Sequence, residues 1–310
     1  MGERPLRAGA VTALVALPLT VGARTLWSFR RLLVRRGLSL ADALAGTLPE
    51  LPPLDREAQG YLVTSLPAAL LAPLQAAHPQ LRAFVRQRYR RSYVSLERGF
   101  DDYLATFSAK TRSTLKRKVR RFAERSGGAL DIRCYRHPDE MAEFHRQARA
   151  VSALTYQERL LDAGLPEDSL PGMRALAERD SIRAWILFLE GRPISYLHAP
   201  ADGDTLIYAH LGFDPAAADL SPGTVLQYEA IRALMGEGRF RRFDFTEGEG
   251  QHKTRFATGR IDCLDLLLLR ATVANIAAAR TVAGFDATVA AAKAAAARLG
   301  VEKVARTLLR

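Results

Sequence analysis

The chain has 310 residues, of which 48% are apolar and 25% are charged. These values are typical of a globular protein with a full core and exclude a disordered chain. The net charge of +12 favours a polyanionic partner such as an anionic membrane, a phosphate-rich cofactor or nucleic acid. The two cysteines, Cys134 and Cys263, are too few for a zinc site or a disulfide framework, so we expect a reducing, cytoplasmic setting.

The first forty residues combine an apolar segment with an arginine cluster. Residues 8–23 are mostly small and apolar, loosely like a signal peptide. However, Pro18 interrupts them, and they fall short of the ~20 apolar residues that span a bilayer. The following RTLWSFRRLLVRRG contains five arginines and no acid, which opposes export. We therefore predict a retained N-terminal basic helix that lies on a membrane or packs on the domain. A signal peptide or a membrane span is the alternative.

The elements that follow alternate between strands and helices. A proline-rich linker at 37–60 leads to a short strand at 60–67, helical material at 68–87 and a strand at 92–96. The next helix, 110–125, contains eight basic residues and one acid. Its basic side chains form either a solvated face or a contact with coenzyme phosphates or anionic lipid headgroups. Nucleic-acid binding is not favoured, because we find no recognised nucleic-acid-binding motif and few aromatics among the arginines.

The second half of the chain is dominated by strands. A strand at 130–136 and a helix that opens at Pro138 precede three consecutive strands, 181–190, 192–200 and 205–213, with turns at Glu190-Gly191 and Asp202-Gly203. After a loop at 214–221 we predict a helix at 225–235, strands at 241–245 and 262–269, and an alanine-rich helical tail from Ala271. This order predicts a mixed α/β fold with a largely antiparallel sheet flanked by helices.

Four stretches in this part of the chain resemble the GNAT acyltransferase fold, in particular its FemAB-like and cellulose-biosynthesis-type (BioF2-like) acetyltransferase domains. They are TRSTLKRKVRRFAE (111–124), LIYAHLGFDP (206–215), LSPGTVLQYEAI (220–231) and FDFTEGEGQHKTRF (243–256). The resemblance covers about residues 100–270. It implies three regions: an N-terminal basic helix with a partial α/β region (1–107), a GNAT-like acyltransferase domain (108–270) and a C-terminal helical tail (271–310).

The resemblance also implies a place for a cofactor. An acyl thioester would lie beside the strand Leu206–Phe213, and the helix after Gly223 would direct its N-terminal amides at the pyrophosphate of acyl-CoA, the co-substrate. The residues implied at this helix start are Ser221, Gly223, Thr224 and Val225. The usual glycine-rich pyrophosphate signature is reduced here to Ser-Pro-Gly-Thr, so an ordinary helix start with Ser221 as cap is the alternative.

Transfer of an acyl group to an amine requires a base for the ammonium and an acid for the thiolate. We predict Asp244 and Glu247 as the acid/base pair, supported by His252 and Lys253. The alternative is a structural salt-bridged turn in which Lys253 pairs with one of the two carboxylates. Tyr208 and His210, on one side of their strand, are candidates to protonate the thiolate or to bind substrate, although a lone strand histidine is more often a satisfied core residue. A metal site made of His198, His210, His252 and Glu247 lacks any tight ligand spacing such as HxxxH, so we expect no metal.

The leading hypothesis is an acyl-CoA-dependent N-acyltransferase that forms an amide on an amine acceptor. The basic N-terminal segment favours a cytoplasmic protein on the inner face of a membrane, with a lipid-like acceptor such as a sphingoid or other long-chain amine in bacterial lipid metabolism. Two alternatives stay open. One is a Fem-type transferase that uses aminoacyl-tRNA, and the other is a catalytically silent GNAT-like module that docks on a membrane or a complex.

Overall fold

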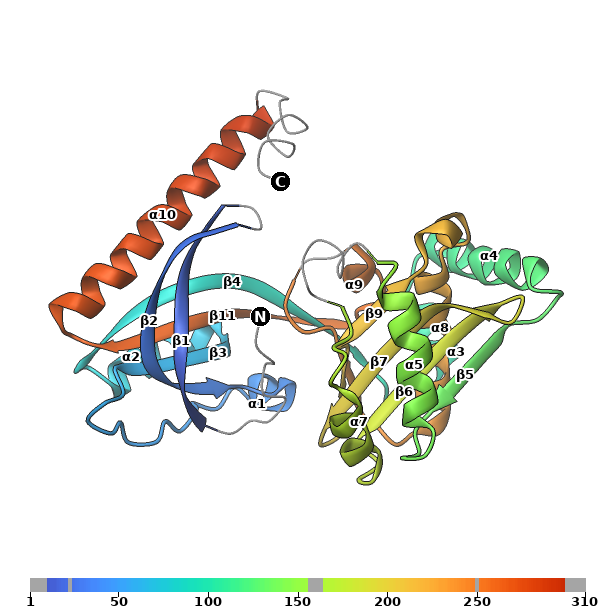
Figure 1. Cartoon of the computed structure of the whole chain (residues 1–310), viewed down its shortest axis with the longest axis horizontal. Coiled ribbons are helices and arrows are strands. Elements are labelled where there is room, and N and C mark those ends of the chain that lie inside the picture. The colour runs from blue at the N-terminus through green and yellow to red at the C-terminus, as the bar shows by residue number, and fades with distance from the viewer. Residues whose placement is uncertain (1–9, 22–23, 156–163, 249–250, 299–310) are drawn as a thin grey trace. The chain divides into compact units, whose positions relative to one another are not determined.

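A computed structural model describes residues 10–21, 24–155, 164–248 and 251–298, apart from a few side chains in the last of these ranges. The described residues form two compact units (Figure 1). One is Arg90–Arg260, and the other consists of residues 10–89 together with 261–298. The predicted boundaries at residues 107 and 270 differ from this division. The difference arises because two long strands, β4 (Leu81–Ser95) and β11 (Gly259–Arg270), each contribute residues to both units.

The unit made from the two ends of the chain has the strand order β1-β2-β3-β11-β4. Strand β1 is antiparallel to β2, β2 is parallel to β3, and β3 is antiparallel to β11. None of the described helices is long and apolar enough to cross a bilayer. The remaining elements are β1 (Ala10–Val21), β2 (Arg24–Gly37), α1 (Leu40–Ala45), β3 (Gly60–Pro67), η1 (Ala68–Leu70), α2 (Leu71–Ala77) and α10 (Val273–Arg298).

Two predictions for this unit were wrong. The N-terminal basic helix is a β-hairpin, in which Ala13 pairs with Leu33 and Leu17 pairs with Phe29. Because side chains alternate between the faces of a strand, this register buries Leu17 and Leu33 in one cluster with residues of β11 and α10. The predicted helix at 68–87 ends at Ala77, since the next residue precedes Pro79, a position that disfavours helical backbone. The chain then continues as β4.

The unit Arg90–Arg260 has the strand order β4-β10-β8-β7-β6-β5, and β9 pairs with β7. Neighbours are antiparallel except β8 and β10, which are parallel. The confirmed turn at Glu190-Gly191 has positive φ at both residues. The elements are α3 (Phe100–Ala105), α4 (Ala109–Arg125), β5 (Asp131–Tyr135), α5 (Met141–Ser152), α7 (Leu170–Ala177), β6 (Ile182–Leu189), β7 (Arg192–Asp202), β8 (Thr205–Ile207), β9 (His210–Phe213), η2 (Pro215–Leu220), α8 (Pro222–Glu237), β10 (Arg242–Asp244) and α9 (Gln251–Phe256).

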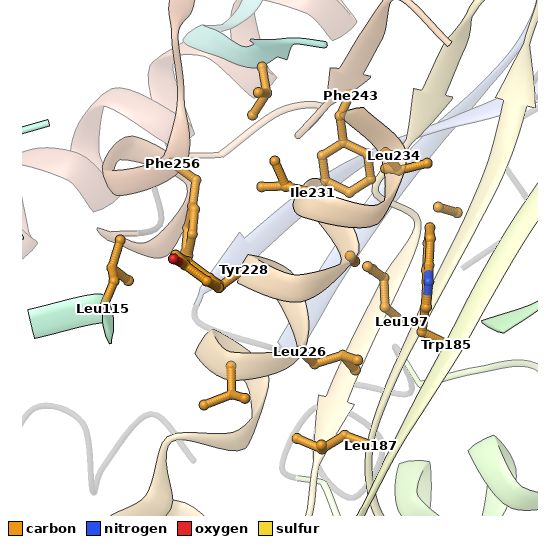
Figure 2. Close-up of a cluster of buried hydrophobic side chains, with 14 of the residues drawn as sticks. Leu115, Trp185, Leu187, Leu197, Leu226, Tyr228, Ile231, Leu234, Phe243 and Phe256 are labelled. Atoms are coloured by element: carbon orange, nitrogen blue, oxygen red, sulfur yellow. The ribbon is translucent and has the colours of Figure 1, made fainter. Parts of the chain in front are cut away.

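Helices pack on both faces of this sheet. On one face, α5 and α7 cover Ala184, Ile186 and Tyr196 of β6 and β7 (Figure 1). On the other face, the cluster around α8 contains Trp185 and Leu197 of the same two strands, and side chains of α3 and α4 join it (Figure 2). The alternation of side chains along β6 and β7 thus supplies both cores. The predicted fold class, a mixed and largely antiparallel sheet flanked by helices with an N-terminal α/β region and a C-terminal helix, is confirmed.

Candidate active site

Strands β8 and β9 diverge from β10 at one point of the sheet. The parallel pairing of β8 with β10 ends where Tyr208 N donates to Asp244 O, at 2.8 Å. Beyond it, Phe245 N donates to Ser92 O of β4, whereas β9 pairs with β7. The chain after β10 therefore follows β4 while β9 follows β7, so the two neighbouring segments separate. We call the place where they separate the wedge.

One edge of β9 faces the wedge with backbone groups that none of the described strands pairs. Asp214 N donates to Ile194 O of β7, at 2.8 Å. In an antiparallel pair only alternate residues direct their N–H and C=O groups at the partner, so Gly212 and His210 also face β7. Leu211 and Phe213 therefore direct theirs to the other side, where the described residues provide no partner strand. An extended ligand with amide groups could hydrogen-bond there as an added strand would.

Helix α8 begins directly after β9 and η2, as the sequence predicted. Ser221 occupies the N-cap position in left-handed conformation, but its side chain caps nothing. Its carbonyl oxygen accepts from Thr224 N and Val225 N, at 2.9 and 3.1 Å, and Val225 is fully buried. Since Pro222 has no N–H, the amide of Gly223 is the one in this first turn without an acceptor among the described residues. Of the four predicted cofactor residues, Gly223 thus has the strongest geometric support.

Gly223 also sets how closely α8 approaches β9. A Cβ atom at this position would lie 3.0 Å from Leu211 Cδ2 and 3.4 Å from Phe213 Cδ1. Any larger residue would have to displace these two side chains. The glycine therefore places a positive helix N-terminus immediately beside the strand that has a free edge.

Asp244, predicted as part of the acid/base pair, is instead buried in an ion pair with Arg91. The two side chains are 0% and 6% exposed. Arg91 Nε donates to Asp244 Oδ1 and Oδ2 at 3.2 and 3.1 Å, and Thr246 N donates to Oδ1 at 2.8 Å. Its oxygens are already bonded and it has no exposed surface, so the carboxylate holds the chain where it leaves β10, and its part in the acid/base pair stays a prediction. Arg91 was not singled out from the sequence.

The loop after β10 is held by Lys253. Its Nζ donates to Phe245 O and Glu247 O, at 2.7 and 2.5 Å, and lies 5.9 Å from the ring centre of Tyr208. Burial lowers the pKa of Lys253, while Glu247 and Asp244 act in the opposite direction. Lys253 therefore fixes the loop, as in the predicted alternative. Its hydrogen bonds go to backbone carbonyls, whereas the alternative paired it with a carboxylate. Glu247 is half-buried. The side chain of His252 and residues 249–250 lie outside the described residues.

Tyr208 and His210 flank the break between β8 and β9. Tyr208 packs edge-on against Phe243 and Phe245, and burial raises its pKa, so it stays protonated. His210 stacks on His198, the residue directly opposite on β7, with 3.3 Å between the two Nδ1 atoms. Burial lowers the pKa of His210, and burial together with His210 and His145 lowers that of His198 to about 3. Both imidazoles are therefore neutral near pH 7, and burial disfavours their protonated forms, that of His198 most strongly.

The arrangement unites a free strand edge, a helix N-terminus, a protonated phenol, neutral histidines and a half-buried carboxylate. Within the ranges described, no three His, Cys, Asp or Glu side chains gather so as to hold a metal ion. These groups can bind an extended, phosphate-bearing ligand and transfer protons. They suit a reaction that needs both an acid and a base.

Comparisons with known proteins agree with this chemistry. Residues 109–254 match the model of a family described as acetyltransferase (GNAT) domain. The matched residues are slightly less than half of the chain, and their similarity to this family supports an N-acyltransferase. No curated protein matches the sequence.

Solved structures are similar to this chain at low sequence identity, and one of them, with a TM-score above 0.5, shows the same fold. The C-terminal domain of a protein described as a lysylphosphatidylglycerol synthetase from Agrobacterium fabrum has 15% identity and a TM-score of 0.51, over 74% of this chain and 72% of that one. L-PGS from Bacillus licheniformis has 14% identity and a TM-score of 0.49, over 72% of each chain. FemX has 11% identity and a TM-score of 0.49, over 85% of this chain and 86% of its own.

Proposed function

We propose that this protein transfers the acyl group of an acyl-CoA to an amine and so forms an amide. The observation that carries the proposal is the wedge, with the start of α8 beside its free strand edge. The pantetheine arm of coenzyme A contains two amide groups, which can bond to the backbone of Leu211 and Phe213. Its pyrophosphate is an anion that suits the free amide of Gly223 and the positive end of the α8 dipole.

In this reaction the amine nitrogen attacks the thioester carbonyl. A C–N bond forms, the C–S bond breaks, the ammonium loses its proton, and the thiolate gains one. We assign the first proton to Glu247, whose carboxylate is only half-buried, with neutral His210 as the second candidate base. Tyr208, protonated because of its burial, is the candidate donor to the thiolate. Asp244 and Lys253 position the loop that carries Glu247.

The test is release of free thiol from acyl-CoAs of several chain lengths in the presence of an amine library. We expect thiol release that depends on the amine, and coenzyme A binding measurable by calorimetry. Binding without turnover on any amine would favour the silent module. No coenzyme A binding, combined with binding of charged tRNA, would favour the aminoacyl-tRNA-dependent alternative. Either result would overturn the proposal.

We also propose that the protein acts at an anionic membrane surface on a lipid-like, long-chain amine. The β1–β2 hairpin supports this, because Leu14, Leu26 and Trp27 are 61%, 61% and 64% exposed. Exposed Arg24 and Arg30 lie on the same hairpin. Apolar side chains next to arginines are the combination that binds anionic leaflets, where each basic residue adds about 1 kcal/mol.

Co-sedimentation with phosphatidylglycerol vesicles at low salt tests this part. We expect the protein to pellet with the vesicles, and the variant Leu26→Ser/Trp27→Ser to remain in the supernatant. The matched control is Leu44→Ser/Leu48→Ser, which removes two exposed leucines from the same unit but outside the hairpin. If the wild type stays in the supernatant, or if both variants lose binding equally, the hairpin is not a membrane anchor and a soluble amine becomes the better acceptor.

A further inference from the structure

A cavity of about 640 Å³ opens beside the start of α4, and none of its lining residues belongs to the wedge. Its walls are formed by the end of β4, by α3 and the loops on either side of it, by the first turn of α4, and by α9 with the segment after it. Seven of the eleven lining side chains bear a hydroxyl group, two are arginines, and none is a carboxylate. Four of these hydroxyls already donate to backbone carbonyls or to Glu97, namely those of Ser95, Tyr103, Thr106 and Thr258. The donors left for an anion are the two guanidinium groups, the hydroxyl of Tyr93 and one hydroxyl of the Ser108–Thr111 pair.

The two arginines, Arg98 and Arg255, are exposed and have no acidic partner within the described part of the chain. The nearest carboxylate along the chain, Glu97, binds Arg241, with Nε at 2.8 Å. Lys118 adds a further positive charge near Arg255. Its pKa is lowered, mainly because it is desolvated and also because Arg255 and Arg117 repel its ammonium group. The cavity thus has a cluster of cations that no acid of the described residues neutralises.

Two features of the walls place Tyr93 and the start of α4 at the cavity. A Cβ atom on Gly259 would lie 2.4 Å from the hydroxyl of Tyr93, so only glycine leaves room for that ring at the cavity wall. Ser108 caps the 17-residue helix α4, accepting from Thr111 N at 3.2 Å, and its Oγ lies 3.0 Å from Thr111 Oγ1. Since one of these two hydroxyls donates to the other, the positive end of the α4 dipole has one hydroxyl hydrogen left that can donate to a bound anion.

We propose that this cavity binds the phosphate group of an organic phosphate ester. A planar guanidinium pairs with two phosphate oxygens at once, and Tyr93 with one hydroxyl of the Ser108–Thr111 pair can supply further donors. The volume exceeds what a phosphate ion alone would fill, and Phe107 provides an apolar wall for the organic part. The ester is either a soluble metabolite or the headgroup of a phospholipid, because both present the same group.

The test compares two variants that lose the same charge. Arg98→Gln/Arg255→Gln removes both guanidinium groups from the cavity, whereas Arg120→Gln/Arg232→Gln removes two exposed arginines elsewhere on α4 and α8. Glycerol 3-phosphate is titrated by calorimetry at constant ionic strength, and phosphatidylglycerol vesicles are tested by co-sedimentation against phosphatidylcholine vesicles. Each lost charge-assisted contact should weaken binding by roughly tenfold or more, and the control should bind like the wild type.

Weakened binding of glycerol 3-phosphate in the cavity variant alone supports a soluble ester, and weakened vesicle binding alone supports a lipid headgroup. Absence of binding to both probes, or equal loss in the control, overturns the proposal. If the arginine variant loses its thermal transition, Tyr93→Phe replaces it, since it removes one wall hydroxyl and no charge. No arm of this test measures acyl transfer, so its outcome is separate from that of the proposed function.

Discussion

Removing Arg91 should destabilise the protein strongly, because its carboxylate partner would remain buried without compensation. Arg91→Met keeps most of the side-chain volume but leaves Asp244, 0% exposed, with no guanidinium. Breaking a buried pair in this way costs about 3–5 kcal/mol. For a unit of this size, each kcal/mol lowers Tm by roughly 2–4 °C, so we expect a drop of roughly 6–20 °C.

Thermal unfolding followed by circular dichroism measures this drop, and two further variants identify its cause. Arg91→Met/Asp244→Asn removes the buried charge and keeps an oxygen for Thr246 N, so it should recover a large part of the lost Tm. Arg241→Met breaks the exposed pair with Glu97 and should shift Tm far less. A wild-type Tm for Arg91→Met, or a double variant as unstable as the single one, would refute the reasoning. If Asp244→Asn folds normally but is inactive, the carboxylate is catalytic after all.

Three other predictions concern the site. Glu247→Gln should reduce turnover roughly 10²–10⁴-fold without changing Tm, and wild-type turnover would remove Glu247 from the mechanism. Burial lowers the pKa of His198 from 6.5 to about 3, so as the pH falls through this range the unfolded chain takes up the proton first. The free energy of unfolding should therefore fall by up to roughly 1.4 kcal/mol per pH unit. Urea titrations of His198→Gln should show a flatter profile, and an unchanged slope contradicts this account. Gly223→Val must displace Leu211 and Phe213 and should weaken coenzyme A binding in calorimetry; unchanged affinity would place the cofactor elsewhere.

Elements defined by local signals were predictable from the sequence. The turn at Glu190-Gly191 and the helix start at Pro222 both follow from residues with strong backbone preferences. The hairpin at 10–37 was not predictable in the same way, because its arginines and apolar residues also suit an amphipathic helix. Its strands are stabilised by pairing with each other and with β3, and strand preference depends on such partners more than on the residues themselves.

The site shows the same limit. The stretch 243–256 attracts attention through its titratable residues, but the role of Asp244 depends on Arg91, which lies 153 positions away in the chain. His198 and His210 lie opposite each other only because the register shifts by one residue between β8 and β9: the pairing set by the Gly203 turn would place His198 opposite Ala209. Two histidines that follow one another on a predicted hairpin were the signal available, but without the turn length their facing positions could not be assigned.

The division of the chain into units constrains the order in which they can form during synthesis. Residues 90–260 are continuous, so they can complete their unit as soon as they leave the ribosome. The other unit cannot, because β3 pairs with β11, with Leu66 opposite Leu264. After residues 10–89 are synthesised, about two hundred further residues must follow β3 before β11 is available, and until then one edge of β3 has no partner strand. Such a waiting edge is where a chaperone would bind, and where aggregation would begin if synthesis stalled.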